Sequence, residues 1–124
     1  GIRNLVLENF VPYDNKTNKG LVLENAVFIE LHRLLSNKMG ELNFWRTKQG
    51  AEVDFIIERG LKLLPIEVKS VLKKDTIPSG LRSFIERFYP EKAIVTNLSF
   101  HGEFVTAGKT RIDFVYPFIL EKFL

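Results

Sequence analysis

The sequence contains no cysteine, which excludes a disulfide framework, a thiolate metal site and a cysteine nucleophile. It has only two histidines, so a metal site would have to use mainly carboxylates. No apolar run approaches the ~20 residues that span a bilayer, and no basic segment followed by a hydrophobic one opens the chain. We therefore expect a soluble, cytoplasmic globule without a membrane partner.

The length and charge of the chain favour one compact unit. Its 124 residues leave room for a single hydrophobic core, so we expect one domain over residues 1–124. Eighteen basic residues against fifteen acidic ones give a net charge of +3, which permits a polyanionic partner without requiring one. Because the chain begins at Gly1 without a methionine, we expect a fragment of a longer protein.

Hydrophobic periodicity predicts the element order α-β-β-β-α-β followed by a tail. We expect helices at about 18–37 and 79–88, and strands at 42–47, 51–58, 61–69 and 92–98. The tail should form one more strand at 111–115 and a helix at 118–124, with Phe104 in a turn. Because a helix links strands 61–69 and 92–98, a right-handed crossover should make them parallel. The expected fold class is α/β, with a mixed central sheet flanked by helices.

Two acids and a lysine stand out on the two middle strands. Strict alternation places Val53 and Phe55 on one face of strand 51–58 and Asp54 on the other. Alternation along strand 61–69 groups Glu67 with Lys69. These three polar side chains are the candidates for a site that performs chemistry.

The hairpin loop decides how these side chains meet. If Arg59-Gly60 forms a two-residue loop, Asp54 lies diagonal to Glu67, and if Gly60-Leu61 forms it, the two acids face each other directly. Both registers put Asp54, Glu67 and Lys69 on one face, within reach of a single metal ion. An odd loop length would separate them.

Carboxylates at this spacing suit a hard divalent cation. Two buried carboxylates repel unless a cation neutralises them or one holds a proton. Oxygen ligands without histidine or thiolate favour Mg²⁺ or Mn²⁺, so Asp54 and Glu67 are the expected metal ligands. Lys69 could hold a water or support the charge that develops on an attacked phosphodiester. Glu24 lies on an otherwise apolar face of the first helix and could complete the ligand set or act as a base.

Basic side chains near these strands are candidates for contacts with a nucleic-acid backbone. Arg46 and Lys48 follow the first strand, and Lys73 and Lys74 follow the strand that carries Glu67. Solvated lysines in a loop need no function, so the charge pattern alone does not assign one.

Several segments together resemble a known family. The Asp54, Glu67 and Lys69 spacing, with a helical Glu24 upstream, resembles the PD-(D/E)XK nuclease superfamily. The more specific resemblance is to the uncharacterised C-terminal domain of bacterial and archaeal AAA-type ATPases. It rests on the segments Gly1–Asn4, Lys19-Gly20 with Glu24-Asn25 and Val27, Trp45–Lys48, Gly50–Phe55 and Ile66–Ser70.

This resemblance implies a restriction-endonuclease-like fold and an ATPase module elsewhere in the same polypeptide. It implies that Asp54 and Glu67 bind the metal, that Lys69 lies near the attacking water, and that Glu24 is an auxiliary ligand or base. The substrate would be DNA, cleaved at its phosphodiester bonds. Val53 stands where the superfamily name has proline.

Other interpretations stay open at this stage. Asp54, Glu67 and Lys69 could form a structural ion-pair network, and Glu24 could pair with a base such as Arg46. The chain could be a non-catalytic DNA-docking or protein-interaction module with a degenerate nuclease fold. It could also form a homodimer through the aromatic-rich tail at 114–124.

Overall fold

The computed structural model describes residues 18–36, 40–73 and 76–124. Three parts of the sequence predictions fall outside these ranges: the segment before Asn18, the end of the first helix at 37, and Lys74. The described chain contains the elements α2 (Asn18–Leu35), β1 (Glu41–Arg46), β2 (Glu52–Arg59), β3 (Lys62–Lys69), α3 (Ser79–Phe88), β4 (Lys92–Asn97), β5 (Glu103–Ala107), β6 (Thr110–Val115) and the 3₁₀ segment η1 (Pro117–Phe123).

The strands form one six-stranded mixed sheet in the order β1-β2-β3-β4-β6-β5. The strands β1, β2 and β3 are antiparallel neighbours, whereas β3, β4 and β6 run parallel. The predicted parallel pairing of the third and fourth strands is therefore confirmed, with Ile66 beside Ile94. The carboxyl ends of three strands thus meet at one edge of the sheet, where ligands commonly bind in α/β folds.

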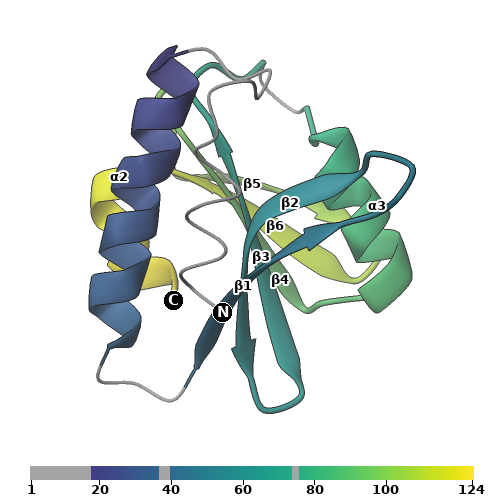
Figure 1. Cartoon of the computed structure of the whole chain (residues 1–124). Coiled ribbons are helices and arrows are strands. Elements are labelled where there is room, and N and C mark those ends of the chain that lie inside the picture. The colour runs from purple at the N-terminus through teal and green to yellow at the C-terminus, as the bar shows by residue number, and fades with distance from the viewer. Residues whose placement is uncertain (1–17, 37–39, 74–75) are drawn as a thin grey trace.

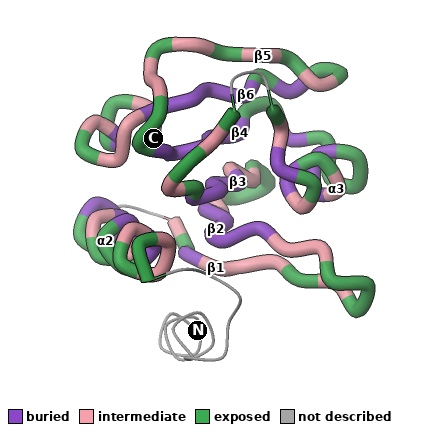
Figure 2. Tube along the Cα trace, turned by 90° about the horizontal axis from the view of Figure 1, so that it is seen from above, coloured by how far each residue is buried: buried purple, intermediate pink, exposed green. Residues whose placement is uncertain are grey.

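Helices cover both faces of the sheet. Figure 1 shows α2 and η1 on one side and α3 on the other, and Figure 2 shows the buried strands between them. On the α2 side, Leu31 packs in a cluster with Phe55 and Ile66, and on the α3 side Phe84 packs in a cluster with Val95. The α/β class with a flanked mixed sheet is confirmed.

The C-terminal part differs from its prediction. Where one strand was expected, two antiparallel strands are found, and Phe104 lies on β5 opposite Asp113 of β6 rather than in a turn. The reason is that Gly108 and Lys109 make a tight turn, with Gly108 at a φ of 60°. The strand before this turn has only five residues, which is too short for a clear periodic signal. The expected terminal helix is the 3₁₀ segment η1.

An irregularity in β2 breaks the alternation expected there. Asn43 of β1 faces Ile56, whereas Trp45 faces Val53, so one β1 residue opposes two β2 residues, Asp54 and Phe55. This is the geometry of a β-bulge. As a result, Val53 packs on the α3 side while Phe55 packs on the α2 side, and the prediction that the two share a face is wrong.

Candidate metal centre

The β2–β3 hairpin has the second of the two registers considered, in which the two acids face each other directly. Phe55 pairs with Ile66 and Arg59 with Lys62, which leaves Gly60 and Leu61 as the loop. Gly60 has a φ of 59°, a conformation that glycine adopts without strain. Continuing this register places Asp54 directly across from Glu67, as predicted for the Gly60-Leu61 loop.

Backbone hydrogen bonds hold both acidic side chains in place. The Val68 amide donates to Oδ2 of Asp54, with 2.8 Å between nitrogen and oxygen. The Asp54 amide donates to Oε1 of Glu67 at 3.3 Å. Each acid therefore binds the strand that carries the other, and Asp54 is one of the two β2 residues that form the bulge against β1. Asp54 and Glu67 are both only 5% exposed.

The three predicted polar residues line one cavity of about 240 Å³. Asp54, Glu67 and Lys69 meet there with Glu52 and with the first residues of α3. The cavity lies at the carboxyl end of β3, on the side of the sheet that α3 covers. The structure thus brings together the two acids and the lysine that the sequence singled out.

Helix α3 closes the cavity through a close backbone approach at Gly80. A Cβ atom at this position would lie 2.0 Å from the carbonyl oxygen of Glu52. Only glycine therefore lets the first turn of α3 lie against the start of β2. The sequence prediction did not single out Gly80, because a glycine inside a helical pattern gives no sign of what it approaches.

The two carboxyl groups oppose each other's ionisation. Burial raises the pKa of Glu67 well above its usual value of 4.5, and the charge of Asp54 and a hydrogen bond between the two side chains raise it further. The ammonium group of Lys69 acts in the opposite direction and lowers the same pKa, but its effect is smaller. The pair therefore favours a shared proton or a bound cation.

The other predicted site residues lie around or away from this cavity. Arg46 is at the end of β1, and its Nε is 3.1 Å from Oε2 of Glu52, which lines the cavity. Arg46 therefore pairs with Glu52, and its predicted alternative partner Glu24 lies elsewhere. Lys48 and Lys73 are exposed in the segments that follow β1 and β3.

Glu24 is completely buried on α2, among residues that pack on the sheet. It is not one of the residues that line the cavity. Within residues 18–36, 40–73 and 76–124, no group of three or more His, Cys, Asp or Glu side chains is placed to hold a metal ion. The role of Glu24 as an auxiliary ligand or base therefore stays a prediction.

The chain matches a known protein family over most of its length. Residues 19–116 match the family described as "Domain of unknown function (DUF4143)". The chain belongs to this family. The match includes every residue of the DUF4143 domain that lines the cavity. The comparison with curated proteins gave no match.

A solved structure shares the fold of this DUF4143 domain. It is described as a refined half-complex from the tetradecameric assembly of Thermococcus gammatolerans McrB AAA+ hexamers with bound McrC. The two chains are 14% identical with a TM-score of 0.57, and the match covers 78% of this chain. It covers 27% of the other chain, so the DUF4143 domain corresponds to a minor part of that protein's length.

No helix in the described ranges is long and apolar enough to cross a membrane.

Proposed function

We propose that this domain is a nuclease-like module that binds Mg²⁺ or Mn²⁺ through Asp54 and Glu67 and acts on the phosphodiester backbone of DNA. The observation that carries this proposal is the convergence of Asp54, Glu67 and Lys69 on one cavity. The resemblance of the sequence to the PD-(D/E)XK nuclease superfamily supports the same assignment of roles.

The donor set fits a hard divalent cation. Both acids supply carboxylate oxygens, which Mg²⁺ and Mn²⁺ prefer. Burial and the charge of Asp54 raise the pKa of Glu67, and both effects are offset when a positive charge lies between the two acids. Two carboxylates leave the remaining coordination positions to water and substrate oxygens, as is common for Mg²⁺ sites.

Each residue then has a distinct task. A bound divalent ion would supply Lewis-acid polarisation and a more acidic water. Asp54 and Glu67 hold that ion. Each of their carboxylates accepts a hydrogen bond from a backbone N–H group, which fixes its position. Lys69 is exposed at the cavity, where its ammonium group can orient a water and stabilise charge on the attacked phosphate. Glu24 keeps its proposed role as an auxiliary ligand or base.

Basic residues beside the cavity are proposed to hold the DNA backbone. Arg46 pairs with Glu52, which lines the cavity. Lys48 and Lys73 are exposed in the segments that follow β1 and β3. Lys74 completes this proposed set. Such contacts position a nucleic acid without reading its sequence.

We further propose that the domain works as part of an AAA-type ATPase. The sequence resembles a C-terminal domain of such ATPases, and the related fold was found in an assembly of AAA+ hexamers. ATP hydrolysis would then take place in a module outside these 124 residues.

Metal titration tests the centre directly. In isothermal titration with Mn²⁺, the unmodified domain should bind and Asp54→Asn should lose affinity by at least about tenfold. Asparagine still offers an oxygen to the Val68 amide, so the fold should be kept. Asp113→Asn is the matched control, because Asp113 is 8% exposed on β6 and pairs with Arg111 at 3.1 Å. Equal Mn²⁺ affinity in all three proteins would rule out Asp54 as a metal ligand and contradict the proposed centre.

Cleavage of plasmid and flap DNA tests the activity. Lys69→Ala should reduce Mn²⁺-dependent cleavage by roughly 10²-fold or more while Mn²⁺ still binds and thermal unfolding stays cooperative. Glu24→Gln, assayed in parallel, tests the proposed role of that acid. Absence of cleavage by the unmodified domain in the presence of bound Mn²⁺ would argue against turnover.

One observation favours a second candidate, a non-catalytic DNA-docking module. The Asp54 carboxylate already has a structural task, because it accepts the Val68 amide at a break in the ladder. In this case the domain should bind DNA with an affinity that falls steeply with salt and is the same in Asp54→Asn. A module that binds only proteins would show no DNA binding in either the unmodified domain or Asp54→Asn.

A further inference from the structure

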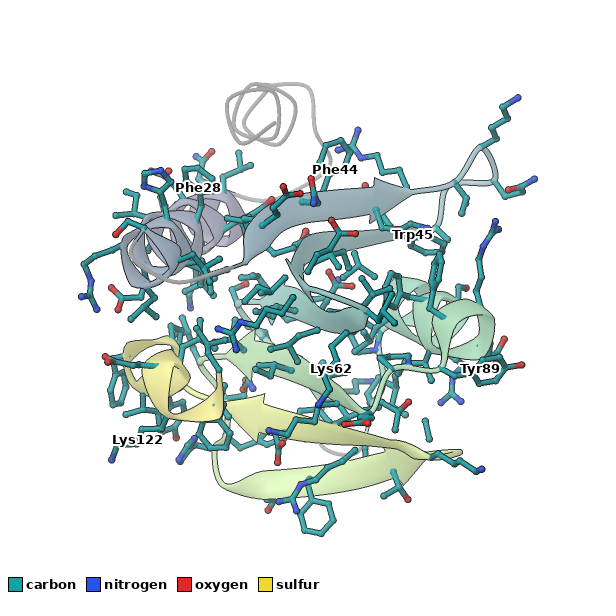
Figure 3. All side chains as sticks on the ribbon, turned by 90° about the horizontal axis from the view of Figure 1, so that it is seen from below. Phe28, Phe44, Trp45, Lys62, Tyr89 and Lys122 are labelled. Atoms are coloured by element: carbon teal, nitrogen blue, oxygen red, sulfur yellow. The ribbon has the colours of Figure 1, made fainter. Side chains whose placement is uncertain are left out.

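A larger cavity of about 400 Å³ lies at the opposite end of the sheet from the metal centre. It is formed around the β2–β3 loop, the end of α3 and the start of β4, and we call it the amino-end groove. Figure 3 views the molecule from below and shows Lys62 near the middle of this side and Tyr89 towards one edge. Its residues take no part in the proposed chemistry.

Large apolar side chains at this groove are exposed to solvent. Leu61 is fully exposed at 104%, Tyr89 is 79% exposed, and Phe88 is 39% exposed. All three line the same groove. Single exposed apolar residues are ordinary on protein surfaces, but several gathered around one concavity are typical of an interaction site.

Tyr89 is held in a backbone conformation that disfavours it. It follows α3 with φ 50° and ψ 51°, the left-handed region that glycine usually occupies at a helix end. Its amide donates to the carbonyl oxygen of Ile85 at 2.9 Å, a bond that glycine would form equally well. The ring itself is mostly exposed, so it adds little to the core. The ring is therefore available for contact with a partner.

The charges of the groove indicate the kind of partner. Arg59, Lys62 and Lys92 line it together with one acidic side chain, Glu91. The Arg59 guanidinium already donates a hydrogen bond to the carbonyl oxygen of Leu124 at 2.8 Å, so Lys62 and Lys92 are the cations that face a partner. The Lys62 ammonium group is 4.0 Å from a Glu91 oxygen, but both side chains are at least 80% exposed, so the attraction is weak. Two copies of this face placed together would bring two surfaces of the same net positive charge against each other. An acidic partner is favoured over a second copy.

We infer that the amino-end groove binds an acidic, apolar segment of a partner protein. Its leucine or phenylalanine side chains enter beside Leu61, Phe88 and Tyr89, and its carboxylates meet Lys62 and Lys92. A nucleic acid would satisfy the cations, but it has no aliphatic side chains to fill a groove that leucines and two phenylalanines line. The apolar lining therefore favours a polypeptide.

Fluorescence anisotropy with designed peptides tests this inference. The probe is a short fluorescein-labelled peptide in which leucine and phenylalanine alternate with aspartate and glutamate. One control peptide replaces its acids by lysine, another replaces its apolar residues by serine, and a single-stranded oligothymidine represents nucleic acid. Only the acidic, apolar peptide should bind the 124-residue protein.

Three variants and a control locate the binding. Lys62→Glu, Leu61→Ser and Tyr89→Gly should each weaken peptide binding by about tenfold or more. Tyr89→Gly should unfold at the same or a higher temperature, because glycine relieves the left-handed conformation. Lys122→Glu makes the same charge change at an exposed site outside the groove and should bind the peptide as the unmodified protein does.

Four results would overturn the inference. The first is no peptide binding at concentrations up to about 1 mM. The second is equal affinity in Lys62→Glu, Leu61→Ser and the unmodified protein. The third is binding of oligothymidine in place of the peptide, lost in Lys62→Glu. The fourth is Tyr89→Gly unfolding at a lower temperature with unchanged peptide affinity. Because the groove lies away from Asp54 and Glu67, Mn²⁺ affinity should be the same in all groove variants.

Discussion

At the scale of single residues, the pairing of Asp54 with Glu67 controls the charge of the candidate centre. Both acids are buried, and each is bonded to the backbone of the other's strand. Burial, and after it the charge of Asp54, raise the pKa of Glu67, so without a cation the pair tends to keep a proton. The ionisation of one side chain therefore affects both the stability of the fold and the affinity for a cation.

The pH dependence of stability follows from this shift. A carboxyl group with a raised pKa stabilises the folded state fully below its unfolded value of 4.5, and this contribution is lost as the pH rises through the raised pKa. Glu67→Gln is neutral at every pH and lacks the effect. In urea unfolding with a chelator present, the unmodified protein should lose stability relative to Glu67→Gln as the pH rises. Parallel curves for the two proteins would contradict the shift.

The sequence was informative about these residues because strand alternation is a local property. The even hairpin loop at Gly60-Leu61 was sufficient to place Asp54 across from Glu67. The bulge in β2 could not be foreseen, because it depends on how Trp45 of β1 pairs with Val53. Glu24 was expected on an apolar helix face and is completely buried on that helix. Its role stays a prediction, since a helical periodicity does not say which part of the sheet a given turn of the helix covers.

At the scale of elements, the contact between α3 and β2 determines the width of the cavity. The Gly80 backbone lies so close to the Glu52 carbonyl that an added methyl group would overlap it. Whatever moves the first turn of α3 away from β2 also moves it away from Asp54 and Glu67, because the same cavity includes Pro78 and Ser79.

Gly80→Ala should therefore destabilise the fold by about 1–3 kcal/mol through overpacking, although alanine favours helices. Ser83→Ala in the same helix is the control, with an expected change within about 0.5 kcal/mol. Chemical denaturation measures both. Equal stability of the two variants would mean that α3 can shift without strain, and Mn²⁺ affinity of Gly80→Ala would then show whether the cavity tolerates the shift.

The 3₁₀ segment η1 forms part of the core. Leu120 is buried in the cluster on the α2 side, whereas Phe118 is 81% exposed. Leu120→Ala should cost about 2–5 kcal/mol, and Phe118→Ala should change the stability by less than about 0.5 kcal/mol. Thermal and urea unfolding of the two variants give the comparison. A similar loss in both would indicate that Phe118 is covered in solution, as the dimerisation hypothesis requires, and light scattering of Phe118→Ala would decide it.

The extent of successful prediction differed among the elements. The strands that carry Asp54 and Glu67 and the helix α3 were predicted within about a residue, because long periodic segments bounded by glycine or proline give clear signals. Strand β5 was missed, since five residues of mixed exposure carry little pattern. The contact of α3 with Glu52 depends on tertiary packing, and no local sequence pattern predicts it.

At the scale of the whole molecule, one sheet separates two hydrophobic clusters. Leu31 belongs to the cluster on the α2 side, and Phe84 belongs to the cluster on the α3 side, where the Trp45 ring meets it edge-on at 5.4 Å between centroids. Both clusters include side chains from β2 and β4. A loss of packing in one cluster would therefore disturb strands that also carry residues of the other cluster.

We therefore expect a single unfolding transition. Leu31→Ala should lower the stability by about 2–5 kcal/mol, measured equally by far-ultraviolet circular dichroism and by the fluorescence of Trp45. Trp45 is the sole tryptophan of the chain and lies on the far side of the sheet from Leu31. A fluorescence transition that stayed in place while the dichroism transition moved would show that the two sides unfold independently.

The hydrogen bond from the Val68 amide to Asp54 makes the centre observable at one backbone atom. The chemical shift of an amide proton depends strongly on the charge of its acceptor, and a cation on Asp54 would withdraw electron density from that oxygen. In an NMR titration with Mg²⁺, the Val68 resonance should therefore move before and further than those of the remote strand β5. Occupancy of the cavity can thus be followed from within the main chain, without a labelled ligand.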